Sequence, residues 1–382
     1  MADVGLNEII KTASREFHLQ TSTLVDEGVI RTEVFEKGQI LFVVNHQFER
    51  RTPVQADSAE SRLRHMVDKF HQSIIEEIDS LFEISEQVFE EENPVAHERI
   101  GQVFLFTHIF DKAEKHFTKA IELDPERHGS FVYLGRCYFM QKRYNRAEKI
   151  LSQILDRKIK YPDLYNMVGL VMMKKEDFRQ ALQYFKEALK QNAAYVEAYF
   201  NLAETILYRV NTLKEKRRIE DLKQSIKFLK IILKKIDDYG NVDDRNHCSL
   251  TKKALVKLDT YKALMLLREY RENAYIRNTP PEVIGFKFQL RLLYSAEEMS
   301  TEVLENYEEE ISRALQKNPS YPDLWHYLAL IHLMQCRHYF LKGLDNFRDA
   351  TRINPQFDKA VKNLRLVEND GREFLALIKT IA

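Results

Sequence analysis

Small and apolar residues recur in the middle of the chain at a fixed interval of 34 residues. Gly101, Gly135 and Gly169 are separated by this interval, and Ala203 follows 34 residues later in a similar context. Two antiparallel helices approach closely only where one side chain is small. The pattern therefore predicts a series of helix pairs, each with its closest contact at one of these positions.

The second helix of each predicted pair has its own signature. Ala113, Phe117 and Ala120 follow one another at offsets of four and three, which places them on one face of a helix. Pro125 then marks the end of this helix, because the residue before a proline disfavours the helical region. The fourth pair contains an apparent insertion of about ten residues, Asn211 to Glu220.

This pattern resembles the tetratricopeptide repeat family over residues 94–235 and again over about 300–366. The resemblance implies a mainly α fold in which helix pairs form a right-handed α-solenoid with a concave groove. It also implies a protein-binding scaffold without chemistry of its own. We accordingly predict a repeat array at 94–238, an irregular helical continuation at 239–300, and C-terminal repeats with a capping helix at 301–382.

The first 58 residues follow a different pattern and predict a small α+β module. A short amphipathic segment, Leu6 to Phe17, precedes two strand-like runs at Val29–Phe35 and Ile40–Phe48. The runs are joined at Glu36-Lys37-Gly38, which is typical of a hairpin turn. We therefore predict a β-hairpin at 29–48, to which Thr21 to Val25 could add a third strand.

Residues 59–93 predict one long amphipathic helix. Its apolar residues recur at a spacing of three and four, from Leu63 and Val67 to Val88. Two roles fit this pattern. The helix could cap the first repeat, or its apolar stripe could form a coiled-coil seam with a second chain.

Composition disfavours most catalytic and nucleotide-binding functions. With 11 Gly in 382 residues, the chain contains no glycine-rich phosphate loop. Cys137, Cys248 and Cys336 are far apart and odd in number, which predicts neither disulfides nor a CxxC site and favours the cytoplasm. The acidic run Asp237-Asp238 with Asp243-Asp244 lacks a calcium-loop pattern, so we expect a solvated loop there. We expect no catalytic, metal or cofactor site, and no transmembrane segment.

Charge is balanced overall but segregated along the chain. Lys and Arg number 58, as do Asp and Glu. From Phe70 to Glu98 there are nine acidic residues and no Lys or Arg, whereas Arg209 to Lys235 contains ten basic and three acidic residues. These two surfaces could meet across a homodimer. The basic stretch is also the basis of an alternative function, a nucleic-acid-binding regulator that uses residues 209–235, although the absence of a wider basic field disfavours nucleic acid.

The concave groove implied by the resemblance is the predicted binding site. Its lining is apolar and aromatic with methionines, which suits an amphipathic helix or an extended apolar peptide. The alternative is that the chain covers these side chains itself. The predicted lining residues are Leu105, Phe106, Val132, Arg136, Phe139, Met140, Asn166, Leu170, Met173, Phe200, Glu204, Leu207 and Tyr208. We expect a non-catalytic adaptor for a protein or peptide partner, with the N-terminal module as a second contact or a self-association element.

Overall fold

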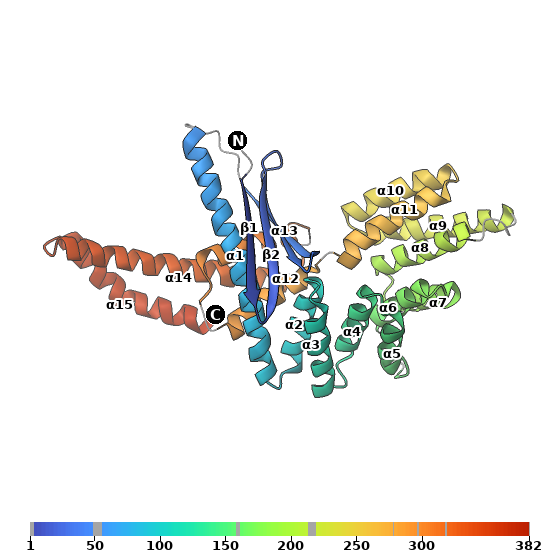
Figure 1. Ribbon diagram of the computed structural model, residues 1–382, viewed down its shortest axis with the longest axis horizontal. Helices are drawn as coiled ribbons and strands as arrows, with labels where there is room; N and C mark the ends of the chain where they lie inside the picture. The colour runs from blue at the N-terminus through green and yellow to red at the C-terminus, as the bar shows by residue number, and fades with distance from the viewer. Residues whose placement is uncertain are drawn as a thin grey trace. The chain divides into compact units, whose positions relative to one another are not determined.

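The computed structural model describes residues 4–48, 56–157, 161–212, 219–277, 279–295, 298–317 and 319–381. It divides into two compact units (Figure 1). One unit comprises Met1–Val103 with Pro280–Ala382, and the other comprises Phe104–Thr279. Helix α2 (Pro94–Phe106) contributes residues to both units.

The first unit begins with a four-stranded antiparallel meander. Its strands β1 (Gly5–Thr12), β2 (Arg15–Leu24), β3 (Val29–Glu36) and β4 (Gln39–Gln47) pair in sequence order. The predicted hairpin at 29–48 is confirmed, with Lys37 and Gly38 both at positive φ in its two-residue turn.

The short amphipathic segment at Leu6 to Phe17 does not supply the helical part expected of an α+β module. These residues form β1 and the start of β2, joined by a second two-residue turn in which Ala13 and Ser14 have positive φ. The alternation of buried residues that begins at Phe17 and continues along β2 has the period of a strand, and it places one face of β2 in the core. This period of two determines the local structure, whereas the apparent helical spacing in β1 does not.

A single long helix, α1 (Ala56–Glu90), covers one face of this sheet (Figure 1). The rings of Phe17 on β2 and Phe82 on α1 lie 5.7 Å apart, and Val67, Ile74 and Ile78 are buried. Helices α12 (Pro281–Tyr294) and α13 (Thr301–Lys317) also pack against α1. Because its own chain buries the apolar stripe, the stripe is not free to form a coiled-coil seam with a second chain.

Partly buried ion pairs join α1 to the two later helices. The ammonium group of Lys287 on α12 pairs with Glu77 on α1 and lies 3.9 Å from a carboxylate oxygen of Glu310 on α13. Burial lowers the pKa of Lys287, but the carboxylates of Glu310 and Glu77 raise that pKa to well above its ordinary value. Arg291 pairs in the same way with Glu76. Part of the acidic run on α1 is therefore neutralised inside the first unit.

Helix α13 also binds the edge strand β4 through Glu309. One carboxylate oxygen of Glu309 accepts a hydrogen bond from the backbone N–H of Gln47 at 2.9 Å, and the other lies 2.5 Å from Nδ1 of His46. Burial raises the pKa of Glu309, but the interactions with His46 and the Gln47 N–H outweigh burial, so this pKa lies below its ordinary value of 4.5. The contact covers part of a strand edge that would otherwise be open to pairing.

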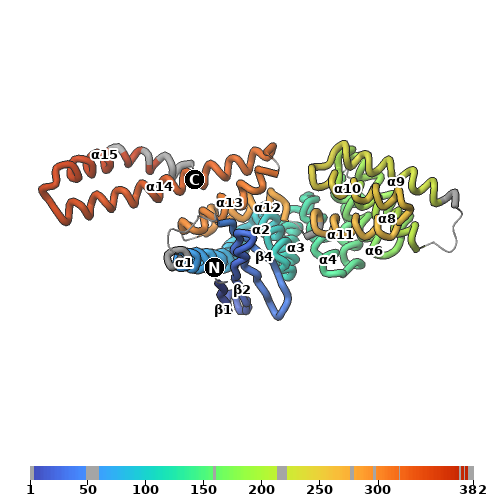
Figure 2. Tube along the Cα trace, turned by 90° about the horizontal axis from the view of Figure 1, so that it is seen from above, coloured from blue at the N-terminus to red at the C-terminus, as the bar shows by residue number. Residues whose placement is uncertain are grey.

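The C-terminal segment departs from the predicted repeats. A repeat at this point requires two helices, whereas residues Pro322–Ile353 form one uninterrupted helix, α14, which packs against α15 (Asp358–Ile381) (Figure 2). The only glycine in this stretch, Gly343, is helical, and no proline or turn sequence interrupts the pattern. Without such a break, the helix continues.

The second unit contains the predicted repeat array. Its helices form consecutive antiparallel pairs, each pair joined by a short connection. The connections that follow α2, α4 and α6 each include one residue at positive φ, namely His108, Lys142 and Glu176. The insertion predicted at 211–220 lies between α8 and α9, and its residues 213–218 are outside the described residues. The helices are α3 (Phe110–Leu123), α4 (His128–Met140), α5 (Tyr144–Leu155), α6 (Pro162–Lys174), α7 (Phe178–Gln191), α8 (Val196–Thr212) and α9 (Ile219–Tyr239).

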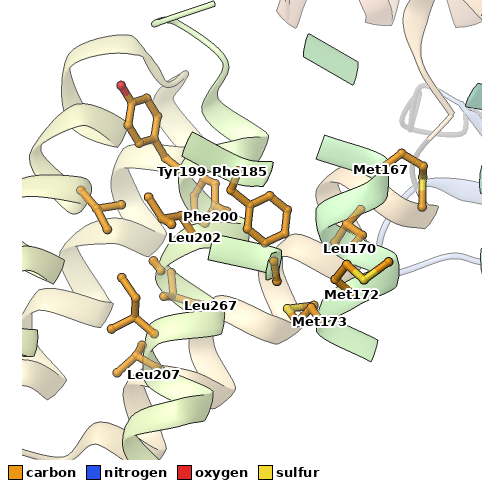
Figure 3. Packing of buried hydrophobic residues seen from close by; sticks show 14 of the residues in the cluster. Met167, Leu170, Met172, Met173, Phe185, Tyr199, Phe200, Leu202, Leu207 and Leu267 are labelled. Carbon is orange, nitrogen blue, oxygen red and sulfur yellow. The ribbon is translucent and has the colours of Figure 1, made fainter. Parts of the chain in front are cut away.

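The two helices of a pair meet at the predicted glycines. A Cβ atom added to Gly135 would lie 2.7 Å from Cδ2 of Leu151, and one added to Gly169 would lie 2.6 Å from Cε1 of Phe185. Both partner side chains are fully buried in one continuous apolar core, part of which Figure 3 shows. The 34-residue interval thus reflects repeated close helix crossings.

After α9 the chain turns inward. Helix α10 (Val242–Val256) packs against α9, but α11 (Thr260–Arg271) packs against α8, a first helix of a pair. A six-residue π-helix, η2 (Glu272–Arg277), follows directly. The segment predicted as an irregular continuation at 239–300 is therefore helical, but α11 and η2 do not extend the row of second helices.

We predict that Gly169→Ala lowers the free energy of unfolding by about 1–3 kcal/mol, because the new methyl group has no room beside the buried ring of Phe185. Urea denaturation followed by circular dichroism measures this change. The matched control is Gly343→Ala in α14, where nothing lies within 4 Å of the added Cβ. This control should gain up to about 1 kcal/mol from helix propensity. Equal effects of both substitutions would contradict the close crossing.

We predict a second effect that depends on pH. Because the pKa of Glu309 is lowered on folding, its contribution to stability is present above pH 4.5 and is lost as the pH falls through the folded-state pKa. Glu309→Gln should therefore be less stable than the wild type at neutral pH, and the difference should shrink as the pH falls below 4.5. Urea denaturation of both proteins across this range tests the prediction. A difference that stays constant would show that the Glu309 carboxylate does not titrate with folding.

Candidate binding surface

The predicted groove residues lie on α2, α4, α6 and α8, and most of them are buried. The half-buried ones are Arg136, Met140 and Tyr208. The buried ones, each at most 7% exposed, are Leu105, Phe106, Val132, Phe139, Asn166, Leu170, Met173, Phe200, Glu204 and Leu207. Of the two alternatives, an empty channel and a surface that the chain covers itself, the structure has the second. That these residues bind a partner remains a prediction.

The covering element on α8 is α11. Its last residue, Arg271, forms an ion pair through Nε with Glu204, and the two side chains are only 1% and 4% exposed. Leu207 on α8 and Leu267 on α11 belong to the same apolar core (Figure 3). A buried guanidinium is stable only beside an opposite charge, so this pair fixes α11 on α8.

The chain continues from α11 across α4. The guanidinium of Arg136 on α4 donates a hydrogen bond from Nη2 to the backbone carbonyl of Tyr275 at 2.5 Å, and it lies 5.0 Å from the ring centroid of Phe106. Arg136 is the one cation that the sequence places among the predicted groove residues. Its observed hydrogen-bond acceptor is a peptide carbonyl of its own chain. We refer to residues Tyr270–Tyr275 as the inner segment.

Two tyrosines of the inner segment pack on Phe200 and share one carboxylate. The rings of Tyr270 and Tyr275 lie 5.3 Å and 5.6 Å from that of Phe200. Their hydroxyl groups donate to the same oxygen of Asp244, at 2.8 Å and 2.6 Å. Burial, together with the bond to Asp244, raises the pKa of both phenols, which keeps them neutral donors.

Asp244 also corrects the expectation of a solvated acidic loop. This residue is 2% exposed and lies at the start of α10, where it forms a capping box with Asn241. One carboxylate oxygen accepts from the backbone N–H of Asn241 at 2.9 Å, and the other accepts from the two tyrosines. Asp244 therefore starts α10 and anchors the inner segment.

A short chain of polar groups continues from α8 to α6. The Asn201 amide donates to Oδ1 of Asn166 at 2.7 Å, and the Asn166 amide donates to the hydroxyl of Tyr195 at 3.2 Å. Among the described residues, Oδ1 of Asn201 and the Nη atoms of Arg271 have no hydrogen-bond partner although they are buried. The surface thus retains an amide acceptor and guanidinium donors that can bind further polar groups.

The polar and aromatic groups of this surface are of the kinds that recognise polypeptides. They comprise amides, guanidinium groups, carboxylates in ion pairs or hydrogen bonds, and aromatic rings, which together suit a polypeptide. Within the described ranges no group of three or more His, Cys, Asp or Glu side chains could hold a metal ion. None of the helices in the described part of the chain is long and apolar enough to cross a lipid bilayer.

The sequence analysis missed the inner segment, although one signal was present. In α11 the buried positions Ala263, Leu264 and Leu267 are followed on the same helix face by Arg271. Arg271 lies on the buried face of the helix, where the helical period predicts an apolar residue. A cation at such a position indicates a buried partner of opposite charge. The position of that partner, Glu204, could not be read from the local pattern.

We predict that Glu204→Ala lowers the free energy of unfolding by about 3–5 kcal/mol, because it leaves the buried Arg271 guanidinium without its carboxylate. The double variant Glu204→Leu with Arg271→Leu should lose much less, because it removes both charges. Urea denaturation of Glu204→Leu, Arg271→Leu and the double variant gives the coupling energy.

Glu272→Ala is the control for this pair. Glu272 lies 3.8 Å from Nη2 of Arg271 but is 34% exposed, so its removal should cost less than about 1 kcal/mol. Similar losses for Glu204→Ala and Glu272→Ala would mean that the buried pair is not the main link between α8 and α11.

Known proteins resemble this chain mainly through the repeat array. Two models described as tetratricopeptide repeat match residues 110–169 and 169–207. Tetratricopeptide repeat protein 13 of Homo sapiens is 28% identical over 126 residues, which is 33% of this chain and 14% of that protein. The chain therefore aligns with only a small part of its curated relative.

The chain is also similar to several solved structures, at low sequence identity. A thermophilic tetratricopeptide repeat protein of Thermus thermophilus is 16% identical with a TM-score of 0.31, and covers 63% of this chain and 100% of its own. YrrB, described as having an unusual peptide-binding site, is 15% identical with a TM-score of 0.31. The match covers 64% of this chain and 96% of the YrrB chain. A monomeric IFIT1 mutant is 12% identical with a TM-score of 0.40. The match covers 78% of this chain and 66% of the IFIT1 chain.

The family assignment rests on the helix pairs, their glycine crossings, the two repeat models and the curated relative. Proteins with these repeats generally serve as scaffolds that bind other proteins. Residues 110–207 of this chain are tetratricopeptide repeats.

Proposed function

We propose that this protein is a non-catalytic adaptor that holds a segment of a partner protein on the inner surface of α4, α6 and α8. The partner would bind where the inner segment lies, either by displacing it or by extending from it. The N-terminal sheet would provide a second contact. The three unpaired cysteines support a reducing compartment such as the cytoplasm.

One observation carries this proposal: the surface already binds a peptide, namely its own. Arg136 binds a main-chain carbonyl, Phe200 packs against two aromatic rings, and Glu204 pairs with a guanidinium. Each of these interactions can be made equally well by a second polypeptide. The inner segment therefore indicates the chemistry of the partner.

The spacing within the inner segment defines that chemistry further. Arg271 and Tyr275 are four residues apart, and the first pairs with Glu204 while the second donates to Asp244. We infer that the partner segment carries an arginine followed by an aromatic residue at about this distance. Its arginine and its phenol would replace the two groups that the chain supplies itself.

The test uses a fluorescent peptide with the sequence of residues 268–277 and a variant in which the chain's own segment is weakened, Tyr270→Ala with Tyr275→Ala. We expect the peptide to bind this variant at least about tenfold more tightly than the wild type, because the two rings no longer compete for Phe200 and Asp244. Fluorescence anisotropy gives both affinities. Circular dichroism establishes that the variant retains its helices.

The matched control is the same peptide with alanine in place of the residues that correspond to Tyr270, Arg271 and Tyr275. This control should bind neither protein, because it cannot pair with Glu204 or donate to Asp244. If the native peptide binds the folded variant no better than the control peptide does, this surface does not accept a segment from a second molecule, and the proposal fails.

A further inference from the structure

Helix α9 displays an exposed row of lysines. Lys223, Lys227, Lys230 and Lys234 follow one another at offsets of four, three and four, which places them on one face of the helix, and all four are exposed. None of them forms an ion pair with any residue that the structure describes. We refer to these four residues as the lysine row.

Apolar side chains lie beside the lysine row. Phe228 is 39% exposed and Ile231 is 54% exposed, although both belong to a helix whose opposite face is fully buried in the core. Between Leu222 and Ile236 the helix contains no acidic residue. A face of this kind fits a partner that combines carboxylates with apolar groups.

The C-terminal half of α1 displays a complementary row of carboxylates. Asp79, Glu83, Glu86 and Glu90 follow one another at the same offsets of four, three and four, and all four are exposed. Asp79 also accepts a hydrogen bond from the hydroxyl of Thr12. We refer to these four residues as the acidic row.

The acidic row also has an apolar neighbour. Phe89 beside it is 36% exposed, and no Lys or Arg occurs between Phe70 and Glu98. Glu76 and Glu77, which pair with Arg291 and Lys287 on α12, do not belong to this row. The acidic row therefore plays no part in those internal ion pairs.

We propose that the lysine row of one molecule binds the acidic row of a second copy of this chain. In both rows the first and last residues are 11 positions apart, which corresponds to about 16 Å along a helix. Because the offsets are the same, each lysine can meet one carboxylate when the two helices lie side by side. Each copy carries both rows, so each copy can provide either side of the contact.

The observations favour a second copy over a polyanion. The chain has no net charge, with 58 basic and 58 acidic residues, so an extended polyanion is not attracted by the molecule as a whole. Phosphates would pair with the lysine row but would leave Phe228 and Ile231 uncovered. The acidic row supplies carboxylates at the matching interval and Phe89 as an apolar partner.

The test measures self-association of the full chain by sedimentation equilibrium. We expect a dimer in about 50 mM salt whose dissociation constant rises at least about tenfold in about 500 mM salt. Lys227→Glu with Lys230→Glu should weaken the dimer at least about tenfold, because the contacts of these two residues with the acidic row become repulsive. Glu83→Lys with Glu86→Lys, the matching positions of the acidic row, should have the same effect.

A mixture of the two charge-reversed proteins is the decisive measurement. In each protein alone, the two reversed side chains of one row face charges of the same sign in the second copy. In the mixture the two changed rows carry opposite charges at every matched position, and the two unchanged rows do so as well, so a heterodimer should form. The matched control is Lys359→Glu with Lys362→Glu on α15, which changes two exposed lysines by the same charge and should leave the dimer unchanged.

Several results would overturn the proposal. These are a wild type that is monomeric in about 50 mM salt, a dimer that both charge reversals leave intact, or a mixture that does not associate. A monomer that binds duplex oligonucleotides or phosphatidylserine vesicles through the lysine row would assign it to a polyanion. Lower unfolding midpoints of both variants without a change in mass would place the pairing within one chain.

Discussion

The close crossing of two helices is the constraint on which the repeat array depends. At Gly135 and Gly169 the missing side chain lets the partner helix approach until Leu151 or Phe185 fills the space. When this contact recurs every 34 residues, all first helices fall into one row and all second helices into another. The first row then presents a continuous surface that is too apolar to remain open to water.

The chain covers this surface with its own polypeptide. Once α11 leaves the row of second helices, Arg271 reaches Glu204 and the following residues reach Arg136 on α4. Polar contacts make the interaction specific, because Asp244 binds both tyrosines and the buried Arg271 pairs with Glu204. Burial of apolar side chains thus explains why a chain segment covers this surface, and the polar contacts determine which segment does so.

Local patterns predicted the local structure well and the long-range contacts poorly. The turn at Gly38 and the glycine crossings follow from backbone geometry and side-chain volume, so the sequence alone indicates them. The strand that begins at Gly5 was missed because its short apolar pattern fits two periods, and only pairing with β2 selects one. The surroundings of Asp244 could not be predicted, since they depend on tyrosines 26 and 31 residues away.

A covalently attached occupant changes how the inner surface responds to concentration. The inner segment competes at a local concentration set by its attachment to α11, which for short connections is on the order of millimolar and does not change with the amount of protein. The apparent affinity of any outside segment is its intrinsic affinity reduced by the fraction of molecules in which the surface is open. The strength of contacts such as Tyr275 with Asp244 therefore sets a threshold that separates strong partners from weak ones.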